Sequence, residues 1–173
     1  MGVKDNFKRE GLGLLSDLGI APFKERFPWI GADLQTLRDT FAYDELPDAN
    51  SSEIRINVPP LKSRKKGGGT LVAYLDKPLG LVGINGLVVL LHGLGGSTRR
   101  RGLTRMASAL VQSNFAVLKI NLRGSDPCRN FVDGTYAAEC NSDLIPVLRR
   151  AREISCQLTN DYQYSKNIPL LGA

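Results

Sequence analysis

The sequence predicts an α/β fold in which an antiparallel strand pair is followed by a parallel β-α-β-α-β unit. Three observations predict it. Two strand candidates come first, and residues 53–58 of the first alternate polar and apolar side chains. A continuous apolar run follows them, and two segments with helical periodicity separate the remaining strand candidates. Strands that alternate with helices of this length form right-handed crossovers, which place the strands in a parallel sheet covered on both faces.

The antiparallel pair is expected at residues 53–58, which alternate as a half-buried strand does, and at residues 70–76. Pro59 and Pro60 end the first strand. The loop between the two strands, KSRKKGGG, holds three consecutive glycines and a basic cluster made of Lys62, Arg64, Lys65 and Lys66. We therefore expect a long basic loop that joins two neighbouring strands.

The parallel unit is expected to begin with the apolar run LVVLL at residues 87–91, which is typical of a strand buried on both faces. A helix with one buried stripe follows and ends near Asn114, because its apolar residues keep a helical spacing: Leu103, Met106, Ala107, Leu110 and Val111. Residues 115–122 then predict the next strand.

A second helix is expected over residues 144–158, with Asp143 as its N-cap. This boundary places Pro146 in the first turn, where the missing N–H costs no helical hydrogen bond. The segment IPLL at residues 168–171 predicts the last strand, which Gly172 and Ala173 follow. Ligands of such sheets bind at the carboxyl ends of the strands, so the loops after residues 91, 122 and 171 are the places to look for a site.

We expect two parts along the chain, an N-terminal arm at residues 1–52 and an α/β domain at residues 53–173. The arm contains Pro22 and Pro28, which limit helix length, and its residues Leu34, Leu37 and Phe41 predict one short helix capped by Asp33.

The composition indicates a globular protein, with 173 residues of which 42% are hydrophobic. No apolar run approaches the roughly 18 residues of a membrane span, and the N-terminus is charged where a signal peptide is apolar, so we expect a cytoplasmic protein with no membrane anchor.

The three cysteines form no C-x-x-C pair, which indicates free thiols and no metal site: Cys128, Cys140 and Cys156. The net charge is +6. It is concentrated in the loop cluster and in Arg99–Arg101, and we interpret both as solvated loops.

The segment HGLGG at residues 92–96 directly follows the apolar strand and contains the only histidine of the sequence, His92. Glycines allow a sharp turn and expose backbone N–H groups, which can hold a developing oxyanion. Two other interpretations stay open, a plain strand-to-helix turn and a dinucleotide loop. The dinucleotide fingerprint is incomplete because Thr98 stands where its last glycine belongs, and the sequence has no phosphate-binding G-K-[ST].

These segments, taken in order, resemble the first half of an α/β-hydrolase, and more narrowly the YheT-like branch of putative esterases. HGLGGS is followed by a helix and then by LKINLRGS, in which residues 121–124 are similar to the N-x-R-G of that branch. The arm segment FPWIGADLQTL is similar to its W-x-x-G-x-H-L-Q-T signature, with Asp33 in place of the histidine. Residues 136–148, which include Asp143, resemble the start of the next helix, and the resemblance covers roughly residues 22–173.

The resemblance implies a serine-dependent carboxylic-ester hydrolase that acts on a small ester without a metal or cofactor. In that family the nucleophile lies in G-x-S-x-G after the strand that here is 168–171, and the acid and the catalytic histidine follow it. We therefore expect the nucleophile directly after Ala173, and a chain that is an N-terminal part, inactive alone. The backbone N–H of Leu94 would be the first oxyanion-hole donor, between the substrate-binding Gly93 and Gly95.

The resemblance also implies structural roles beside the site for His92, whose ring would bind backbone, and for Arg123. Arg123 would orient the neighbouring loop, or else form a surface salt bridge. Two further functions remain alternatives, a non-catalytic module that binds a small molecule or a protein, and a nucleotide or nucleic-acid binder. A catalytic pair of Ser125 and His92 is disfavoured because Ser125 lacks the sequence context of a nucleophile. The sequence predicts no oligomeric state.

Overall fold

A computed structural model of the chain describes residues 24–25, 27–28, 30–31, 33–34, 50–62, 68–79, 83–93, 95–135, 138–164 and 166–173. The chain divides into two compact units, Met1–Asp44 and Glu45–Ala173. In the first unit the backbone of Asp33 and Leu34 is helical, so Asp33 belongs to the helical stretch and does not precede it. Leu37 and Phe41, the other residues of the predicted arm helix, lie outside the described residues.

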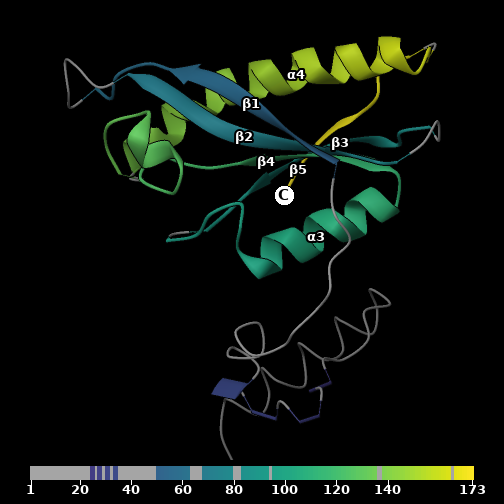
Figure 1. The fold of residues 1–173 in the computed structure, drawn as a ribbon, viewed down its shortest axis with the longest axis horizontal. Coiled ribbons are helices and arrows are strands. Elements are labelled where there is room, and N and C mark those ends of the chain that lie inside the picture. The colour runs from purple at the N-terminus through teal and green to yellow at the C-terminus, as the bar shows by residue number, and fades with distance from the viewer. Residues whose placement is uncertain are drawn as a thin grey trace, which may run out of the picture. The chain divides into compact units, whose positions relative to one another are not determined.

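The second unit contains a five-stranded mixed sheet in the order β1-β2-β4-β3-β5 (Figure 1). The strands are β1 (Asn50–Val58), β2 (Gly69–Lys77), β3 (Gly86–Leu91), β4 (Phe115–Ile120) and β5 (Leu170–Gly172). β1 and β2 are antiparallel, as predicted, and β2 is also antiparallel to β4. β3 is parallel to both β4 and β5. The predicted α/β fold class, an antiparallel pair followed by a parallel unit, is therefore confirmed.

Two helices cover opposite faces of this sheet, as Figure 1 shows: α3 (Arg101–Gln112) and α4 (Leu144–Asp161). α4 packs on the larger of two apolar clusters through its buried residues Val147, Ala151, Ile154 and Leu158. α3 packs on the smaller cluster, where Ala107 contacts the strand residues Val88, Leu90 and Val117. α3 joins β3 to β4 on one side of β3, whereas α4 joins β4 to β5 on the other side. Because the direction across the sheet reverses, right-handed connections place the two helices on opposite faces and bury β3 on both sides.

Several predicted boundaries differ from the structure: β1 begins three residues earlier, at Asn50, and α4 ends three residues later, at Asp161. The ends of β4 and β5 and the predicted capping role of Asp143 differ as well. β4 ends at Ile120, two residues earlier than expected: the Asn121 N–H still donates to the Val72 carbonyl of β2, but the Leu122 N–H turns to the His92 ring. β5 begins at Leu170 and includes Gly172, which the sequence places in a turn. Asp143 does precede α4, but its side chain does not cap the helix. The carboxylate of Asp143 binds Arg123 in place of the helix N–H groups.

A buried ion pair lies on the central strands, and the sequence pattern did not predict it. Nζ of Lys119 lies 2.7 Å from Oδ2 of Asp76, and both residues are buried. Ser51 also donates a hydrogen bond to the Asp76 carboxylate. The neighbouring strands β2 and β4 bring the two charges together, so each neutralises the other inside the sheet.

Candidate functional site

A pocket of about 410 Å³ lies where β3 and β4 end. The loop after β3 and the segment after β4 form its walls, which places it at the carboxyl ends of two parallel strands, as expected for this class of sheet. The residues that line it are His92, Gly93, Gly95, Gly96, Ser97, Arg100, Arg123, Gly124, Ser125, Asp126, Arg129 and Thr135. Of the residues that the sequence predicts for the site, the pocket brings together His92, Gly93, Gly95 and Arg123, whereas Leu94 lies outside the described residues.

The imidazole of His92 binds backbone groups through both nitrogens. The Leu122 N–H donates a hydrogen bond to Nε2 at 3.1 Å, and Nδ1 lies 2.8 Å from the carbonyl oxygen of Gly93. These two contacts require the neutral ring with its proton on Nδ1, because Nε2 must accept and Nδ1 must donate. The ring therefore fastens the loop after β3 to the end of β4 and leaves no nitrogen free to take a proton from a substrate or a serine.

The described glycines of the loop after β3 have different physical reasons to be glycine. Gly95 has φ +68°, a backbone conformation that side chains disfavour. At Gly96 an added Cβ would lie 2.9 Å from the Gly93 carbonyl oxygen and 3.1 Å from the His92 ring, so the close packing excludes it. At Gly93 an added Cβ would meet nothing within 4 Å. Neither packing nor a positive φ requires glycine there, and its missing side chain leaves the pocket open.

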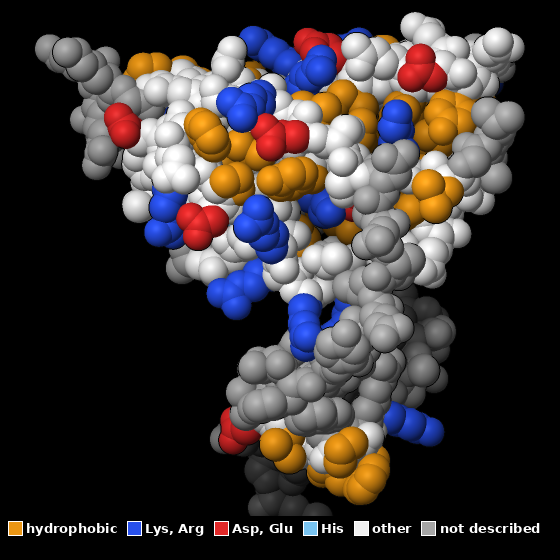
Figure 2. All heavy atoms as spheres, viewed as in Figure 1, with side chains coloured by type: hydrophobic (Ala, Val, Ile, Leu, Met, Phe, Trp, Pro, Cys, Tyr) orange, Lys and Arg blue, Asp and Glu red, His pale blue; other side chains and the backbone are white. Residues whose placement is uncertain are grey.

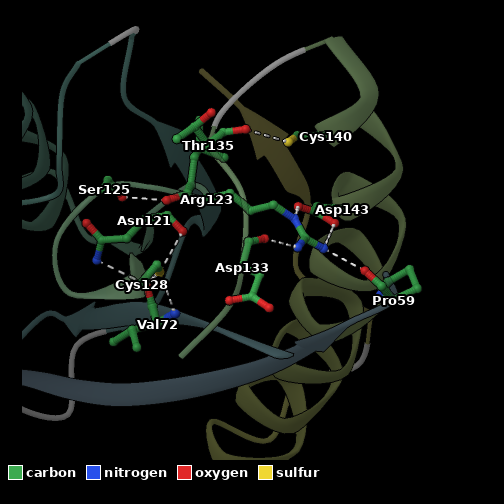
Figure 3. Close-up of polar contacts among 11 residues, drawn as sticks. Pro59, Val72, Asn121, Arg123, Ser125, Cys128, Asp133, Thr135, Cys140 and Asp143 are labelled. Atoms are coloured by element: carbon green, nitrogen blue, oxygen red, sulfur yellow. Dashed lines mark hydrogen bonds and ion pairs between the residues drawn. The ribbon is translucent and has the colours of Figure 1, made fainter. Parts of the chain in front are cut away.

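Asn121 fixes both walls of the pocket to the sheet. Its Oδ1 accepts a hydrogen bond from the Thr98 N–H at 2.9 Å, and its Nδ2 donates to the Val72 carbonyl at 3.0 Å. Asn121 is fully buried, and Figure 3 shows its side chain beside Val72 and Cys128. The sequence pattern marked Asn121 as part of N-x-R-G but assigned it no role. Its role as a brace between the two loops comes from the structure alone.

Arg123 is a buried residue at the centre of a polar network (Figure 3). Its Nε lies 2.6 Å from Oδ2 of Asp143, and its Nη2 donates to Oδ1 of the same carboxylate at 3.0 Å. The guanidinium also donates to the carbonyls of Asp133 at 2.8 Å and Pro59 at 2.6 Å. The alternative of a surface salt bridge is wrong, because the side chain is 0% exposed.

This network keeps the Arg123 guanidinium charged in spite of its burial. The hydrogen bond to Asp143 raises the pKa of Arg123 above its ordinary value, and the charge of that carboxylate adds to the effect, whereas burial opposes it. One cation thereby holds the start of α4, the end of β1 and the segment around Asp133 against the pocket wall.

Ser125 and Cys128, which follow Arg123, bind backbone groups instead of each other or His92. The Ser125 hydroxyl donates to the Leu122 carbonyl at 2.6 Å. Cys128 accepts a hydrogen bond from the Val72 N–H at 3.1 Å and donates to the Asn121 carbonyl at 3.2 Å. Burial raises the pKa of the Cys128 thiol, with the Val72 contact acting in the opposite direction, so this thiol is a poor nucleophile.

The end of β5 lies beside the strand that leads into the pocket. The Ala173 N–H donates to the Val89 carbonyl at 3.0 Å, and the Leu91 N–H donates to the Ala173 carbonyl at 3.1 Å. The parallel ladder of β3 and β5 therefore continues through Ala173, one residue beyond β5, and places Ala173 opposite Leu90, two residues before His92.

An apolar groove of about 500 Å³ lies between α4 and the strands β3 and β5. It is lined by residues of β3, α4 and the C-terminal segment: Val89, Leu91, Leu144, Val147, Leu148, Leu170, Leu171, Gly172 and Ala173. All three residues of β5 are exposed, including Leu170 and Leu171, so this strand has one paired edge and one open edge.

The charges on the visible face are mixed. Figure 2 shows Lys and Arg side chains interspersed with Asp, Glu and hydrophobic ones over the face that it draws.

Among the described residues no helix has the length and apolar character that a membrane span needs. In the same part of the chain no three His, Cys, Asp or Glu side chains come together as metal ligands.

The sequence matches no family model and no curated protein. Solved structures with a similar fold include an α/β serine hydrolase without a lid from Xanthomonas campestris, with 22% identity and a TM-score of 0.47 over 64% of this chain and 48% of that one. An esterase from Pyrococcus furiosus has 16% identity and a TM-score of 0.48 over 72% and 42%. An α/β serine hydrolase homologue from Coxiella burnetii has 18% identity and a TM-score of 0.46 over 76% and 64%. The chain thus spans less than two thirds of the length of each.

Proposed function

We propose that residues 53–173 form the N-terminal part of the catalytic domain of a serine-dependent carboxylic-ester hydrolase in the YheT-like branch of the α/β-hydrolases, with residues 1–52 as an arm. The observation that carries this proposal is the parallel pairing of β5 with β3, which brings Ala173 level with the end of β3. A nucleophile on the turn after β5 would stand beside the pocket that is lined by His92, Gly93, Gly95 and Gly96. The order of the HGLGG and N-x-R-G segments along the chain supports the same conclusion.

The proposed reaction is acyl transfer to water. A serine directly after Ala173 attacks the ester carbonyl, the alcohol leaves, and water releases the acid from the acyl-enzyme. The N–H of Leu94 is the proposed first donor to the tetrahedral oxyanion, and Gly93 and Gly95 are proposed to border the substrate. A donor of this kind contributes 10²–10³ in rate when the rest of the site is present, about 2.7–4 kcal/mol. Residues 1–173 alone are therefore proposed to be inactive.

His92 has a structural role in this proposal, and the general base is a second histidine that follows the nucleophile in sequence. The contacts of Leu122 support this assignment. Its N–H donates to the imidazole of His92, whereas its carbonyl accepts from the Ser125 hydroxyl. Both candidate members of a His92–Ser125 pair are thus occupied by the backbone of the same residue.

Hydrolysis of p-nitrophenyl acetate tests the proposal. The 173-residue chain is compared with a chain extended by the coding sequence past Ala173. We expect turnover from the extended chain only, and its loss when the serine after Ala173 is replaced by alanine. Turnover by the 173-residue chain, or a continuation without Ser-x-Gly in its first three residues, would overturn the proposal.

A second candidate is a non-catalytic module that binds a small molecule, and one observation favours it. The pocket at the ends of β3 and β4 has walls that Asn121 and Arg123 brace, which suits it to hold a ligand. The two functions separate in the same assay, because an extended chain that binds ligand and hydrolyses no ester fits only the binding module.

A further inference from the structure

The pocket at the ends of β3 and β4 carries more positive than negative charge. Among the described residues three arginines line it, Arg100, Arg123 and Arg129, and one carboxylate does, that of Asp126. Arg123 is neutralised by Asp143 behind the wall, and Arg129 lies 2.8 Å from Asp126. These pairs leave the charge of Arg100 in excess.

Arg100 is placed at the rim of the pocket by the loop that it helps to hold. Its Nη2 donates to the Gly95 carbonyl at 3.3 Å, and the residue is exposed. Within the described ranges Arg100 forms no ion pair with a carboxylate. A guanidinium has five N–H donors in a planar fork, so one contact to a carbonyl leaves donors for a ligand.

The described residues that line the pocket include no aliphatic side chain and no Phe, Tyr or Trp. Apart from the charged residues, they are one histidine, one threonine, two serines and four glycines. Sites for apolar ligands are lined predominantly by hydrophobic and aromatic side chains. This pocket therefore suits a small polar group better than an alkyl chain, and the apolar groove beside β5 is a separate feature.

The N-terminus of α3 combines the positive end of the helix dipole with two arginine side chains. Arg100 and Arg101 stand at the start of α3, and the first turn of this helix contains no acidic residue. Helix N-termini favour anions and disfavour cations. An anion in the pocket would be attracted by the excess guanidinium and by the end of the helix together.

We propose that this pocket binds the anionic end of a small ester, a carboxylate or a phosphate, with Arg100 as the main cation and Arg129 as the second. The ester part of this inference rests on the proposed function, whereas the anion part rests on the pocket itself. Arginine recognises both anions through paired N–H donors. Gly93 keeps the neighbouring wall open for the rest of the ligand. Asp126, which shares Arg129 with the ligand, lowers the affinity for the anion.

The test is a titration of the 173-residue chain, followed by NMR, with two matched probes. Monomethyl succinate carries one carboxylate, and dimethyl succinate is its neutral counterpart. We expect the anionic probe to bind at least tenfold more tightly, and R100Q to weaken its binding about fivefold or more, with R100K retaining most of it. D126N is expected to tighten binding, a gain that a folding defect cannot imitate. R150Q, which changes an arginine on α4 paired with Glu153, is the control and is expected to leave binding unchanged.

Equal affinity of the wild-type chain for the two probes would overturn the proposal. A D126N variant that binds the anionic probe no more tightly than the wild-type chain would overturn it as well. An effect of R150Q as large as that of R100Q would also overturn it, because diffuse net charge would then explain the binding. The proposed function fails separately. An extended chain that binds the anionic probe selectively and hydrolyses no ester retains the anion site and loses the hydrolase. An extended chain that hydrolyses neutral and anionic methyl esters equally well retains the hydrolase and loses the anion site.

Discussion

Leu122 and His92 are joined by a hydrogen bond in which the Leu122 N–H donates to Nε2 at 3.1 Å. Nδ1 of the same ring contacts the Gly93 carbonyl at 2.8 Å. The imidazole thus spans the loops after β3 and β4, and the geometry fixes which nitrogen carries the proton. A histidine in this position shapes the pocket by holding these two loops together.

His92 is expected to populate a single tautomer. Because Nε2 accepts a hydrogen bond, we expect the neutral ring with its proton on Nδ1. The sequence contains a single histidine, so a long-range ¹H–¹⁵N spectrum shows one imidazole without ambiguity. A dominant Nε2–H tautomer would contradict the structural role of the ring.

The pair of Arg123 and Asp143 is expected to be a large contributor to stability. D143A leaves the Arg123 guanidinium buried without its carboxylate, and removal of one partner of a buried pair costs about 3–5 kcal/mol. E153A breaks an exposed pair with Arg150 and is the matched control, with an expected cost of about 0–1 kcal/mol. Urea unfolding measures both free energies. A cost for D143A as small as that for E153A would show that the network does not hold the fold together.

Gly93 and Gly96 are expected to respond differently to the same substitution. G96A forces a Cβ to within 2.9 Å of the Gly93 carbonyl, so we expect a clear loss in the free energy of unfolding. G93A places its methyl in open space and is expected to change that free energy by less than about 1 kcal/mol in either direction. The comparison is made by urea unfolding of the two variants. Equal destabilisation would contradict the view that the shape of the pocket, and not the fold, requires Gly93.

Cys128 makes stability depend on pH in the alkaline range. Burial raises the pKa of this thiol, so the folded chain keeps the proton at pH values where the unfolded chain loses it. The unfolded state then binds fewer protons, and the free energy of unfolding falls as pH rises above the unfolded value of about 8.5. The contribution is fully present below that pH. C128A is expected to remove part of this slope, and C156A, which changes an exposed cysteine, is expected to retain it.

The same thiols differ in reactivity. Under native conditions we expect an alkylating reagent to modify Cys156 first, because Cys128 and Cys140 are buried. Rapid alkylation of Cys128 would show that its thiol is not protected as the structure has it. The same conclusion would follow if the free energy of unfolding depended on pH equally in the wild-type chain and in C128A.

The fold could be predicted because its signals are local. The apolar run that forms β3 is continuous, and the periodicity of the α3 residues is visible within one stretch of sequence. The end of β5 was less accessible. Gly172 has the composition of a turn, but hydrogen bonds to β3 extend the ladder through Ala173. Tertiary pairing here overrides the local preference of the residues.

The polar contacts of the candidate site could be predicted only in part, because they join distant segments. Arg123 and Asp143 are 20 residues apart, and Pro59 is 64 residues from the guanidinium that it binds. No periodic pattern connects such positions. The start of α4 after Asp143 could be predicted, but the pairing of Asp143 with Arg123 could not. An aspartate serves equally as an N-cap and as one half of a buried ion pair, so the residue type does not distinguish the two roles.

Mass-spectrometric mapping of a fluorophosphonate label tests the central claim most directly. The reagent modifies activated serines, and it is applied to the 173-residue chain and to the chain extended past Ala173. We expect no label on residues 1–173 in either sample and a single label on the residue that directly follows Ala173. A label on Ser125, or on any other serine within the 173 residues, would contradict it.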